Sequence, residues 1–335
     1  MKAVQVLDHG GPETMRLVDL PEPEPGPGQV VIRVESAAVN WSDLVRRGGG
    51  LYPFPTPMPF VPGGEVAGRV EAVGVGVAHV AAGDEVFALV GGDGSGGYAE
   101  LAVAEAASTI PRPPSVSADE AAALIIAGGT AMLLLREAAR LEKGESVLVE
   151  AAGGGVGSYA VQLAKLLGAG PVIGAAGTAA RRAAAVEAGA DHVLDYTEGG
   201  WGRRVRDLTD GRGVDVALET VGRPTLGEAF DSLAAFGRMV VYGMASGEAG
   251  ALSAQQQEAL FYRPALNQTV TGFNLGVYFG VRPEAAVAAL TEVVGLAAAG
   301  SLTVPVGQRM PLADAARAHE LLARREVVGK IILKP

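Results

Sequence analysis

An apolar strand that leads directly into a glycine turn and an amphipathic helix is the feature that most restricts how this chain can fold. The strand and turn read Val147-Leu148-Val149-Glu150-Ala151-Ala152-Gly153-Gly154-Gly155-Val156-Gly157. After the turn, apolar residues recur at the spacing of one helical face, at Val156, Ala160, Leu163, Ala164 and Leu167. A strand, a tight turn and a helix in this order indicate one βα unit of a parallel sheet.

The glycine turn also matches the fingerprint of a dinucleotide site. Against G-x-G-x-x-G it reads Ala152-x-Gly154-x-x-Gly157, with Gly155 and Val156 between the two glycines. Gly154 allows the backbone to approach a pyrophosphate, and Gly157 allows the helix to pack closely on the strand. The helix N-terminus offers N–H groups and the positive end of its dipole to the phosphates. We therefore expect a dinucleotide at this turn.

The region around the turn alternates strands and helices. Short apolar strands recur roughly every 20–25 residues, at 146–150, 171–175, 192–195, 214–219 and 238–242. A further strand at 269–273 would complete the sheet. Strands that are apolar throughout and separated by helices indicate a parallel sheet covered on both faces. The fold class is therefore α/β, with a doubly wound Rossmann domain.

The chain on either side of this region has a different texture. Residues 1–120 carry many prolines and short β-like runs at 29–35, 65–75, 85–90 and 98–103, which indicates an irregular β-rich domain. From about residue 274 we expect helices near 283–299 and 314–324 and a last strand at 330–333. The prediction is a β-rich domain in two parts, 1–120 and 274–335, with the Rossmann domain, 121–273, inserted between them.

The residues after the second strand of the Rossmann domain favour NADP over NAD. NAD sites usually place an acid there, on the ribose diol. Here the sequence is Ala175-Ala176-Gly177-Thr178-Ala179-Ala180-Arg181-Arg182, with no acid and two arginines. An arginine can hold a 2′-phosphate through charge-assisted hydrogen bonds, each worth about 1.5–3 kcal/mol. We expect NADPH as the cofactor, with either Arg181 or Arg182 as the main phosphate ligand.

Charge and cysteine content exclude several functions. The net charge of −10 makes nucleic acids and anionic membranes poor partners. Without cysteine there are no disulfides, iron–sulfur clusters, thiol nucleophiles or Cys-containing zinc sites. The four histidines have no metal-site spacing, and no hydrolase or NTPase motif is present. No signal sequence or membrane-length apolar run is evident, so we expect a cytoplasmic protein.

Several short motifs follow one another along nearly the whole chain. They are Asn40-x-x-Asp43, Gly50-Leu51-Tyr52-Pro53, Pro62-Gly63-x-Glu65-x-x-Gly68, Gly97-Tyr98-Ala99-Glu100, Gly129-Thr130-Ala131, the glycine turn, and Gly189-Ala190-Asp191 before Tyr196. Each motif alone is weak, but their order and spacing are specific. On these motifs the chain resembles the medium-chain dehydrogenase/reductase superfamily, and within it the zinc-free quinone oxidoreductase branch.

The resemblance implies a GroES-like catalytic domain, with NADPH in a cleft between it and the Rossmann domain. Thr130 would contact the nicotinamide side of the cofactor. Thr178, Arg181 and Tyr196 would hold the 2′-phosphate, with Gly177 in the same turn. The other cofactor-lining residues would be Thr220, Tyr242, Gly243, Met244, Ala245, Phe273, Asn274, Leu275 and Lys330.

The resemblance also bears on the chemistry. Zinc-dependent relatives carry a His directly before the Glu of the Pro-Gly-x-Glu motif, whereas this chain has Gly64. Without a metal the acceptor must be intrinsically electrophilic, and the protein supplies orientation and hydrogen bonds. Candidate catalytic residues are Asn40, to orient the acceptor oxygen, Tyr52, to donate to it, and Asp43. Each also has a structural interpretation: Asn40 as a turn residue, Asp43 as a helix N-terminal acid and Tyr52 as core.

Three functions remain open at this point. The leading hypothesis is an NADPH-dependent quinone oxidoreductase. An enone or enoyl double-bond reductase would use the same apparatus. A non-catalytic NADPH-binding module is the third possibility.

Three further features complete the sequence-based predictions. The strand at 269–273 is β-branched, uncharged and expected at the edge of the sheet, where relatives join two sheets, so we predict a homodimer. Gly129 stands where relatives often have Leu, which would widen the pocket. Residues 91–97 are rich in glycine and predict either a loose turn or a mobile lid.

Overall fold

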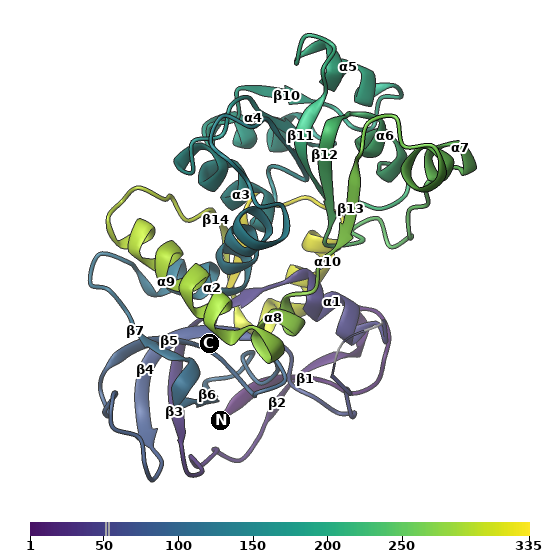
Figure 1. Ribbon diagram of the computed structural model, residues 1–335. Coiled ribbons are helices and arrows are strands. Elements are labelled where there is room, and N and C mark those ends of the chain that lie inside the picture. Colours follow the sequence, from purple (N-terminus) through teal and green to yellow (C-terminus); the bar gives the residue numbers. More distant parts are fainter. Residues whose placement is uncertain (51, 53) are drawn as a thin grey trace. The chain divides into compact units, whose positions relative to one another are not determined.

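The computed structural model describes residues 1–50, 52 and 54–335, which form two compact units. Unit 1 consists of Met1–Ile126 and Val294–Pro335, and unit 2 of Ala127–Val293. In Figure 1 the purple first part of the chain and its yellow end both belong to unit 1. One unit is thus inserted in the sequence of the other. Leu51 and Pro53 of the motif Gly50-Leu51-Tyr52-Pro53 lie outside the described residues.

The units begin and end at other residues than the predicted domains. Unit 2 continues past 273 through α8 (Leu275–Val281) and most of α9 (Pro283–Ala298). Two ion pairs hold this segment to residues 134–138, the helical turn that continues α2. They are Arg282–Glu137 at 3.2 Å and Arg136–Glu292 at 2.8 Å. Ion pairs between residues so far apart in the chain do not change the local hydrophobic pattern, so the sequence could not predict this boundary. The first boundary lies at 126/127, inside α2 (Ala118–Leu133), rather than at 120/121.

Unit 1 is built on two β-sheets. β1 (Lys2–Val6) pairs with β2 (Met15–Asp19), and a seven-stranded sheet has the order β14-β15-β3-β4-β5-β7, with β6 paired to β3. The strands of the larger sheet are β3 (Gln29–Val39), β4 (Glu65–Val73), β5 (Glu85–Leu89), β6 (Leu101–Glu105), β7 (Thr109–Pro111), β14 (Val306–Pro311) and β15 (Lys330–Lys334). The helices between them are α1 (Trp41–Arg47) and α10 (Ala315–Ala323), with short turns η1 (Pro12–Thr14), η2 (Ala106–Ser108) and η5 (Leu312–Asp314).

The last strand of the chain brings distant residues together in unit 1. β15 lies antiparallel to β3, with Ile331 opposite Val39. Alternate residues of both strands, including Ile32, Ile331 and Leu333, are buried in one apolar core. This register sets Lys330 beside the end of β3, where the chain continues into Asn40 and α1.

The strand predicted at 98–103 is displaced in the structure to β6, Leu101–Glu105. The reason is that Tyr98 and Ala99 pair with a different strand. The Val4 amide donates to the Tyr98 carbonyl at 2.8 Å, and Ala3 forms a bridge with Ala99. Residues 98–105 alternate in the same way whether they pair with β1 or with β3. The sequence therefore does not reveal where the pairing with β1 ends and β6 begins.

Unit 2 contains the predicted doubly wound domain, and the fold class is confirmed. Its six parallel strands have the order β10-β9-β8-β11-β12-β13. They are β8 (Val147–Glu150), β9 (Val172–Ala175), β10 (His192–Leu194), β11 (Val214–Glu219), β12 (Leu233–Val241) and β13 (Thr269–Gly272). The helices are α3 (Gly155–Leu166), α4 (Ala179–Glu187), α5 (Trp201–Asp207), α6 (Leu226–Asp231) and α7 (Ala254–Gln257), with π-turns η3 (Leu134–Ala138) and η4 (Glu258–Tyr262). As predicted, β13 is the last strand of the sheet.

One helical stretch, Ala118–Ala138, is long and apolar enough to satisfy the criteria for a membrane span. Its length comes from α2 continuing into η3, which the apolar run in the sequence did not reveal. Within the protein, 78% of an 18-residue apolar window in this stretch is buried, as is usual for a core helix. The cytoplasmic location stays a prediction.

Candidate functional site

The glycine turn after β8 is closed by backbone contacts. Gly154 is the N-cap of α3 without a capping side chain, and the first turn of α3 holds no acidic residue. A Cβ on Gly157 would lie 2.3 Å from the carbonyl oxygen of Ala151, so only glycine lets the helix start this close to the strand. The positive end of α3 is thus not neutralised by the helix itself, which suits a pyrophosphate.

The predicted cofactor residues of unit 2 gather at the carboxyl edge of its sheet. They follow the strands at 154–157 after β8, 177–178 after β9, 196 after β10, 220 after β11, 242–245 after β12 and 273–275 after β13. The strand order reverses between the neighbours β8 and β11. Open parallel sheets bind ligands outside the carboxyl ends at such a reversal. Thr130 lies on α2 and is 7% exposed.

The end of β9 carries the predicted ribose-binding residues. Thr178 caps α4, its hydroxyl accepting from the Arg181 amide at 3.3 Å. A Cβ on Gly177 would lie 3.0 Å from the Tyr196 ring, so residues 177 and 196 are neighbours in the structure. Arg182 donates to Asp195 at 2.6 Å and to the Ala176 carbonyl at 3.1 Å. Both bonds use the Nη1 atom, and the ion pair balances the charge of Arg182.

The loops after β11 and β12 are tied to one another. The Ala245 amide donates to the Thr220 carbonyl at 2.8 Å, and a Cβ on Gly243 would lie 2.3 Å from the Thr220 hydroxyl oxygen. Burial raises the pKa of Tyr242, whose hydroxyl is hydrogen-bonded to Thr220. Met244 is exposed.

The loop after β13 begins α8. The Asn274 side chain caps this helix by accepting from the Gly276 amide at 2.9 Å. Phe273 stacks on Tyr278, with ring centroids 5.1 Å apart, and Leu275 is half-buried as the first residue of the helix.

Two buried acids at this edge were not among the predicted site residues. Glu150 ends β8, Glu219 ends β11, and both are 0% exposed. The signal in the sequence was an acid at the last position of each of two neighbouring, largely apolar strands.

In unit 1, Asn40 belongs to a buried polar cluster. Its amide donates to Glu65 Oε1 at 2.9 Å, and Lys330 donates to the Asn40 Oδ1 atom at 2.5 Å. Lys330 also contacts Glu65 Oε1 at 3.0 Å, while Glu65 Oε2 accepts from the Ile126 amide at 2.7 Å. All three side chains are at least nine-tenths buried. The amide plane of Asn40 is therefore fixed from both ends.

Asp43 extends the cluster on the other side of Asn40. Its Oδ2 atom accepts from the Asn40 amide N–H at 2.8 Å and from the Tyr98 hydroxyl at 3.0 Å. Burial raises the pKa of Asp43 to about 6. These contacts are the ones expected if Asp43 serves as an acid at the N-terminus of a helix.

His319 also belongs to this cluster, and its two contacts fix which ring nitrogen carries the proton. Arg47 can only donate, so its contact at 3.1 Å makes Nδ1 of His319 the acceptor. The ring proton is then on Nε2, which faces the Tyr98 oxygen at 3.2 Å. Burial, followed by the charge of Arg47, lowers the pKa of His319 to about 3, so the ring stays neutral.

Tyr52 lies against the glycine-rich segment 91–97. Its hydroxyl is 3.5 Å from the Asp93 carbonyl oxygen, a long contact, and burial raises its pKa. The Arg46 guanidinium lies 4.8 Å from the Tyr52 ring centroid and 5.1 Å from that of Phe60. It also pairs with the Asp93 carboxylate at 2.5 Å and with Thr56 at 2.8 Å. Arg46 thus holds both Tyr52 and the segment, as expected for a turn rather than a lid.

The place of a zinc ligand in metal-dependent relatives is filled by backbone in this chain. A Cβ on Gly64 would lie 3.3 Å from the Gly94 carbonyl oxygen and 3.3 Å from Ile126 Cδ1. A side chain at this position would require these neighbours to give way by a few tenths of an ångström. Among the described residues, no group of three or more His, Cys, Asp or Glu could hold a metal.

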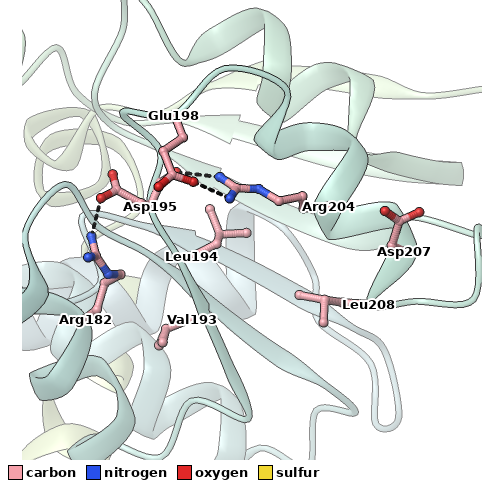
Figure 2. A pocket seen from close by; sticks show the side chains of 8 residues that line it. All are labelled: Arg182, Val193, Leu194, Asp195, Glu198, Arg204, Asp207 and Leu208. Atoms are coloured by element: carbon pink, nitrogen blue, oxygen red, sulfur yellow. Dashed lines mark hydrogen bonds and ion pairs between the residues drawn. The ribbon is translucent and has the colours of Figure 1, made fainter.

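Figure 2 shows a separate surface cavity of about 540 Å³ beside β10 and α5. It is lined by Arg182, Val193, Leu194, Asp195, Glu198, Arg204, Asp207 and Leu208. Arg182 pairs with Asp195 and Arg204 with Glu198. The charges of these two arginines are thus balanced within the wall.

A doubly wound sheet with a glycine turn at its strand reversal, inserted in a β-rich unit, defines a nucleotide-dependent dehydrogenase or reductase. Residues 26–114 match the family described as alcohol dehydrogenase GroES-like domain, and residues 155–291 match zinc-binding dehydrogenase. A quinone oxidoreductase of Pseudomonas aeruginosa is 36% identical, over 100% of this chain and 99% of its own. A 2-haloacrylate reductase of Burkholderia is 32% identical, over 99% of this chain and 98% of its own.

Among solved structures, Escherichia coli quinone oxidoreductase complexed with NADPH has a TM-score of 0.90 and 34% identity, over the whole of both chains. The chain therefore belongs to the medium-chain dehydrogenase/reductase superfamily, in its quinone oxidoreductase branch. The resemblance drawn from the short motifs is confirmed.

Proposed function

We propose that the protein is an NADPH-dependent reductase that delivers hydride to a quinone without a metal. The observation that carries this proposal is the glycine turn at the reversal between β8 and β11, with arginine instead of an acid beyond β9. Relatives named quinone oxidoreductases, one of them solved with NADPH, support the choice of cofactor and acceptor.

The residues present fit NADPH. Gly154, Gly155, Val156 and Gly157 would hold the pyrophosphate at the N-terminus of α3, which no acid of its first turn neutralises. Gly177, Thr178, Arg181 and Tyr196 would hold the ribose 2′-phosphate, and the other cofactor residues stay as predicted. Bound there, NADPH supplies the hydride.

Asn40 is the proposed donor to the acceptor oxygen. Glu65 accepts one of its two Nδ2 hydrogens, and the other is the one Asn40 can offer. Lys330, buried against Oδ1, withdraws electron density from the amide and makes that N–H a stronger donor. This arrangement suits stabilisation of negative charge that develops on an acceptor oxygen.

The other two catalytic candidates have different roles in this proposal. The Tyr52 hydroxyl makes only a long contact with Asp93, so it can turn to an acceptor at little cost. Asp43 is a positioning residue, because its carboxylate holds the Asn40 backbone and Tyr98. Lys330 stays a predicted cofactor contact as well as a partner of Asn40.

The absence of a metal follows in this proposal from Gly64 and from the backbone of segment 91–97 beside it. Such an enzyme cannot polarise an ordinary ketone with a Lewis acid, so it needs an acceptor that takes hydride unaided. Quinones and alkenes conjugated to a carbonyl satisfy this condition.

The experiment that tests the function is NADPH oxidation, followed spectrophotometrically, with quinones, enals and enones as acceptors. The expected result is turnover with at least one quinone and a preference for NADPH over NADH. Tight NADPH binding without turnover of any acceptor would favour the non-catalytic module.

Reduction of a conjugated double bond is the second candidate function. It is favoured by the likeness to a 2-haloacrylate reductase, whose name denotes an alkene conjugated to a carboxylate. Product identification by mass spectrometry separates the two functions, because quinone reduction gives a hydroquinone and alkene reduction a saturated carbonyl compound.

We also propose a homodimer joined through β13. The strand is at the edge of the sheet and carries no charge. The segments before and after it expose large apolar side chains: Phe261 at 66%, Tyr262 at 81%, Val277 at 55% and Val281 at 73%. An exposed apolar edge of this kind favours pairing with a second copy.

A further inference from the structure

The Glu150 and Glu219 carboxyl groups meet at the strand reversal. They end the neighbouring strands β8 and β11, and both lie within 3.2 Å of the Thr225 hydroxyl oxygen. In the described part of the chain, neither carboxyl forms an ion pair with a lysine, arginine or histidine. Two uncompensated charges at this depth would repel each other strongly, so a single proton between them is the stable arrangement.

Each carboxyl also holds the loop that follows β11. Glu150 Oε2 accepts from the amides of Thr220 and Val221, both at 3.3 Å. Glu219 Oε1 accepts from the Gly222 amide at 2.6 Å. The Thr225 hydroxyl lies 3.2 Å from one oxygen of each acid. Four donors from one loop therefore converge on two side chains.

One oxygen of each acid accepts no hydrogen bond from this loop. Glu150 Oε1 and Glu219 Oε2 are buried and have no conventional hydrogen-bond donor among the described residues. A proton held between the carboxyl groups satisfies them. Burial, followed by the charge on Glu219, raises the pKa of Glu150 well above its ordinary value, and burial raises the pKa of Glu219 as well.

The neighbouring elements add one more ionisable group. Tyr242 from β12 is hydrogen-bonded to Thr220 and lies within electrostatic reach of both acids. The first turn of α3, residues 155–158, has no ionisable side chain. On α6, Glu228 accepts from the amides of Gly200 and Gly202 instead.

We propose that Glu150 and Glu219 are positioning residues for the cofactor: one proton shared between them fixes the loop at 220–225 against the glycine turn. Glu150 directly precedes that turn, and Thr220 is itself a predicted cofactor residue. The inference rests on the proposed NADPH function. When the shared proton is lost at alkaline pH, the two charges repel, the loop loosens, and affinity for NADPH falls.

The test compares variants that keep or remove the hydrogen bonds. In Glu150→Gln, the amide donates to Glu219 and its oxygen accepts from Thr220 and Val221, so no titratable proton is needed. Glu150→Ala removes all of these bonds. Asp215→Asn is the matched control, because Asp215 on β11 accepts from the Ser146 amide before β8 at 2.8 Å, at the opposite end of the same two strands.

NADPH dissociation constants are measured by fluorescence titration from pH 6 to 10. Wild type should lose affinity at alkaline pH, Glu150→Gln should stay within about threefold of wild type at neutral pH without that loss, and Glu150→Ala should bind about 10–100-fold more weakly. Asp215→Asn should follow wild type. An alkaline loss in Glu150→Gln equal to that of wild type, or wild-type affinity in Glu150→Ala, would overturn the proposal.

Thermal melting of the nucleotide-free proteins gives an independent readout. An acid whose pKa is raised on folding loses its stabilising contribution as pH rises from its unfolded value toward its folded value. The melting temperature of Glu150→Gln should therefore rise relative to wild type as pH increases, and a difference independent of pH would refute proton sharing. Failure of wild type to bind NADPH would refute the proposed function, while these melting curves would still decide the protonation of the pair.

Discussion

At the scale of single residues, the two arginines after β9 differ in what holds them. Arg182 is paired with Asp195, and we propose Arg181 as the main ligand of the 2′-phosphate. Arg181→Ala should raise KM for NADPH by about 10–100-fold, the value of one charge-assisted hydrogen bond, with little change for NADH. Steady-state kinetics with both nucleotides measure this.

Arg182→Ala is the control for that substitution. It leaves Asp195 without its partner and should lower stability, but not the preference for NADPH. Equal rises in KM for NADPH and NADH in Arg181→Ala would refute the phosphate assignment.

Asn40→Ala tests the donor to the acceptor. The ion pair between Lys330 and Glu65, at 3.0 Å, does not depend on Asn40, so the variant should fold. Loss of an oxyanion donor should lower kcat by about 100-fold or more, with KM for NADPH nearly unchanged. An unchanged kcat in a variant with normal melting behaviour would exclude this role.

The sequence predicted Asn40 and Asp43 as site residues, but it did not predict which side chains contact them. Asn40 and Asp43 stand three apart at a helix start, a local pattern that can be read directly. Lys330 reaches Asn40 across 290 residues, and His319 reaches Tyr98 across 221. These contacts join segments that are far apart in the chain, which is why His319 had no signal in the sequence.

At the scale of elements, two helical glycines predict opposite responses to alanine. In α3 a Cβ on Gly157 would lie 2.3 Å from the Ala151 carbonyl, whereas in α2 a Cβ on Gly129 meets nothing within 4 Å. Gly157→Ala should cost about 1–3 kcal/mol and weaken NADPH binding. Gly129→Ala should stabilise by up to about 1 kcal/mol.

Chemical denaturation and NADPH titration of the two glycine variants provide the check. A Gly157→Ala protein that binds NADPH like wild type would contradict the close approach of helix and strand.

Elements with strong periodicity were predictable to within a few residues. β11 was predicted at 214–219 and is found at Val214–Glu219, directly after Gly213, whose φ is 90°. β12 begins at Leu233, five residues before the predicted 238, since the pattern there is interrupted by Gly237 and by Phe236 with a φ of 61°. Tertiary pairing extends a strand beyond what its own pattern shows.

At the scale of the whole molecule, the edge strand β13 predicts assembly. Thr271→Lys places a charge in the middle of the proposed contact, where two copies would repel each other. Light scattering at micromolar concentration should show a dimer for wild type and a monomer for this variant. Val75→Lys, at a site 82% exposed in unit 1, should remain dimeric. A monomeric wild type would refute the dimer.

The insertion of one unit in the other could be inferred from the sequence, because the alternation of strands and helices ends near residue 274 and a mixed texture returns. The exact limits could not. The ion pairs of Arg282 with Glu137 and of Glu292 with Arg136 assign the segment after β13 to unit 2, and no local pattern encodes them.

The most direct measurement of the central claim is NADPH oxidation with a quinone by enzyme dialysed against a chelator. Full activity after chelation, with NADPH preferred over NADH, is the predicted result, because the proposed hydride transfer relies on NADPH and on hydrogen bonds from the protein and not on a metal. Activity that is lost with the chelator and restored by zinc would contradict the account.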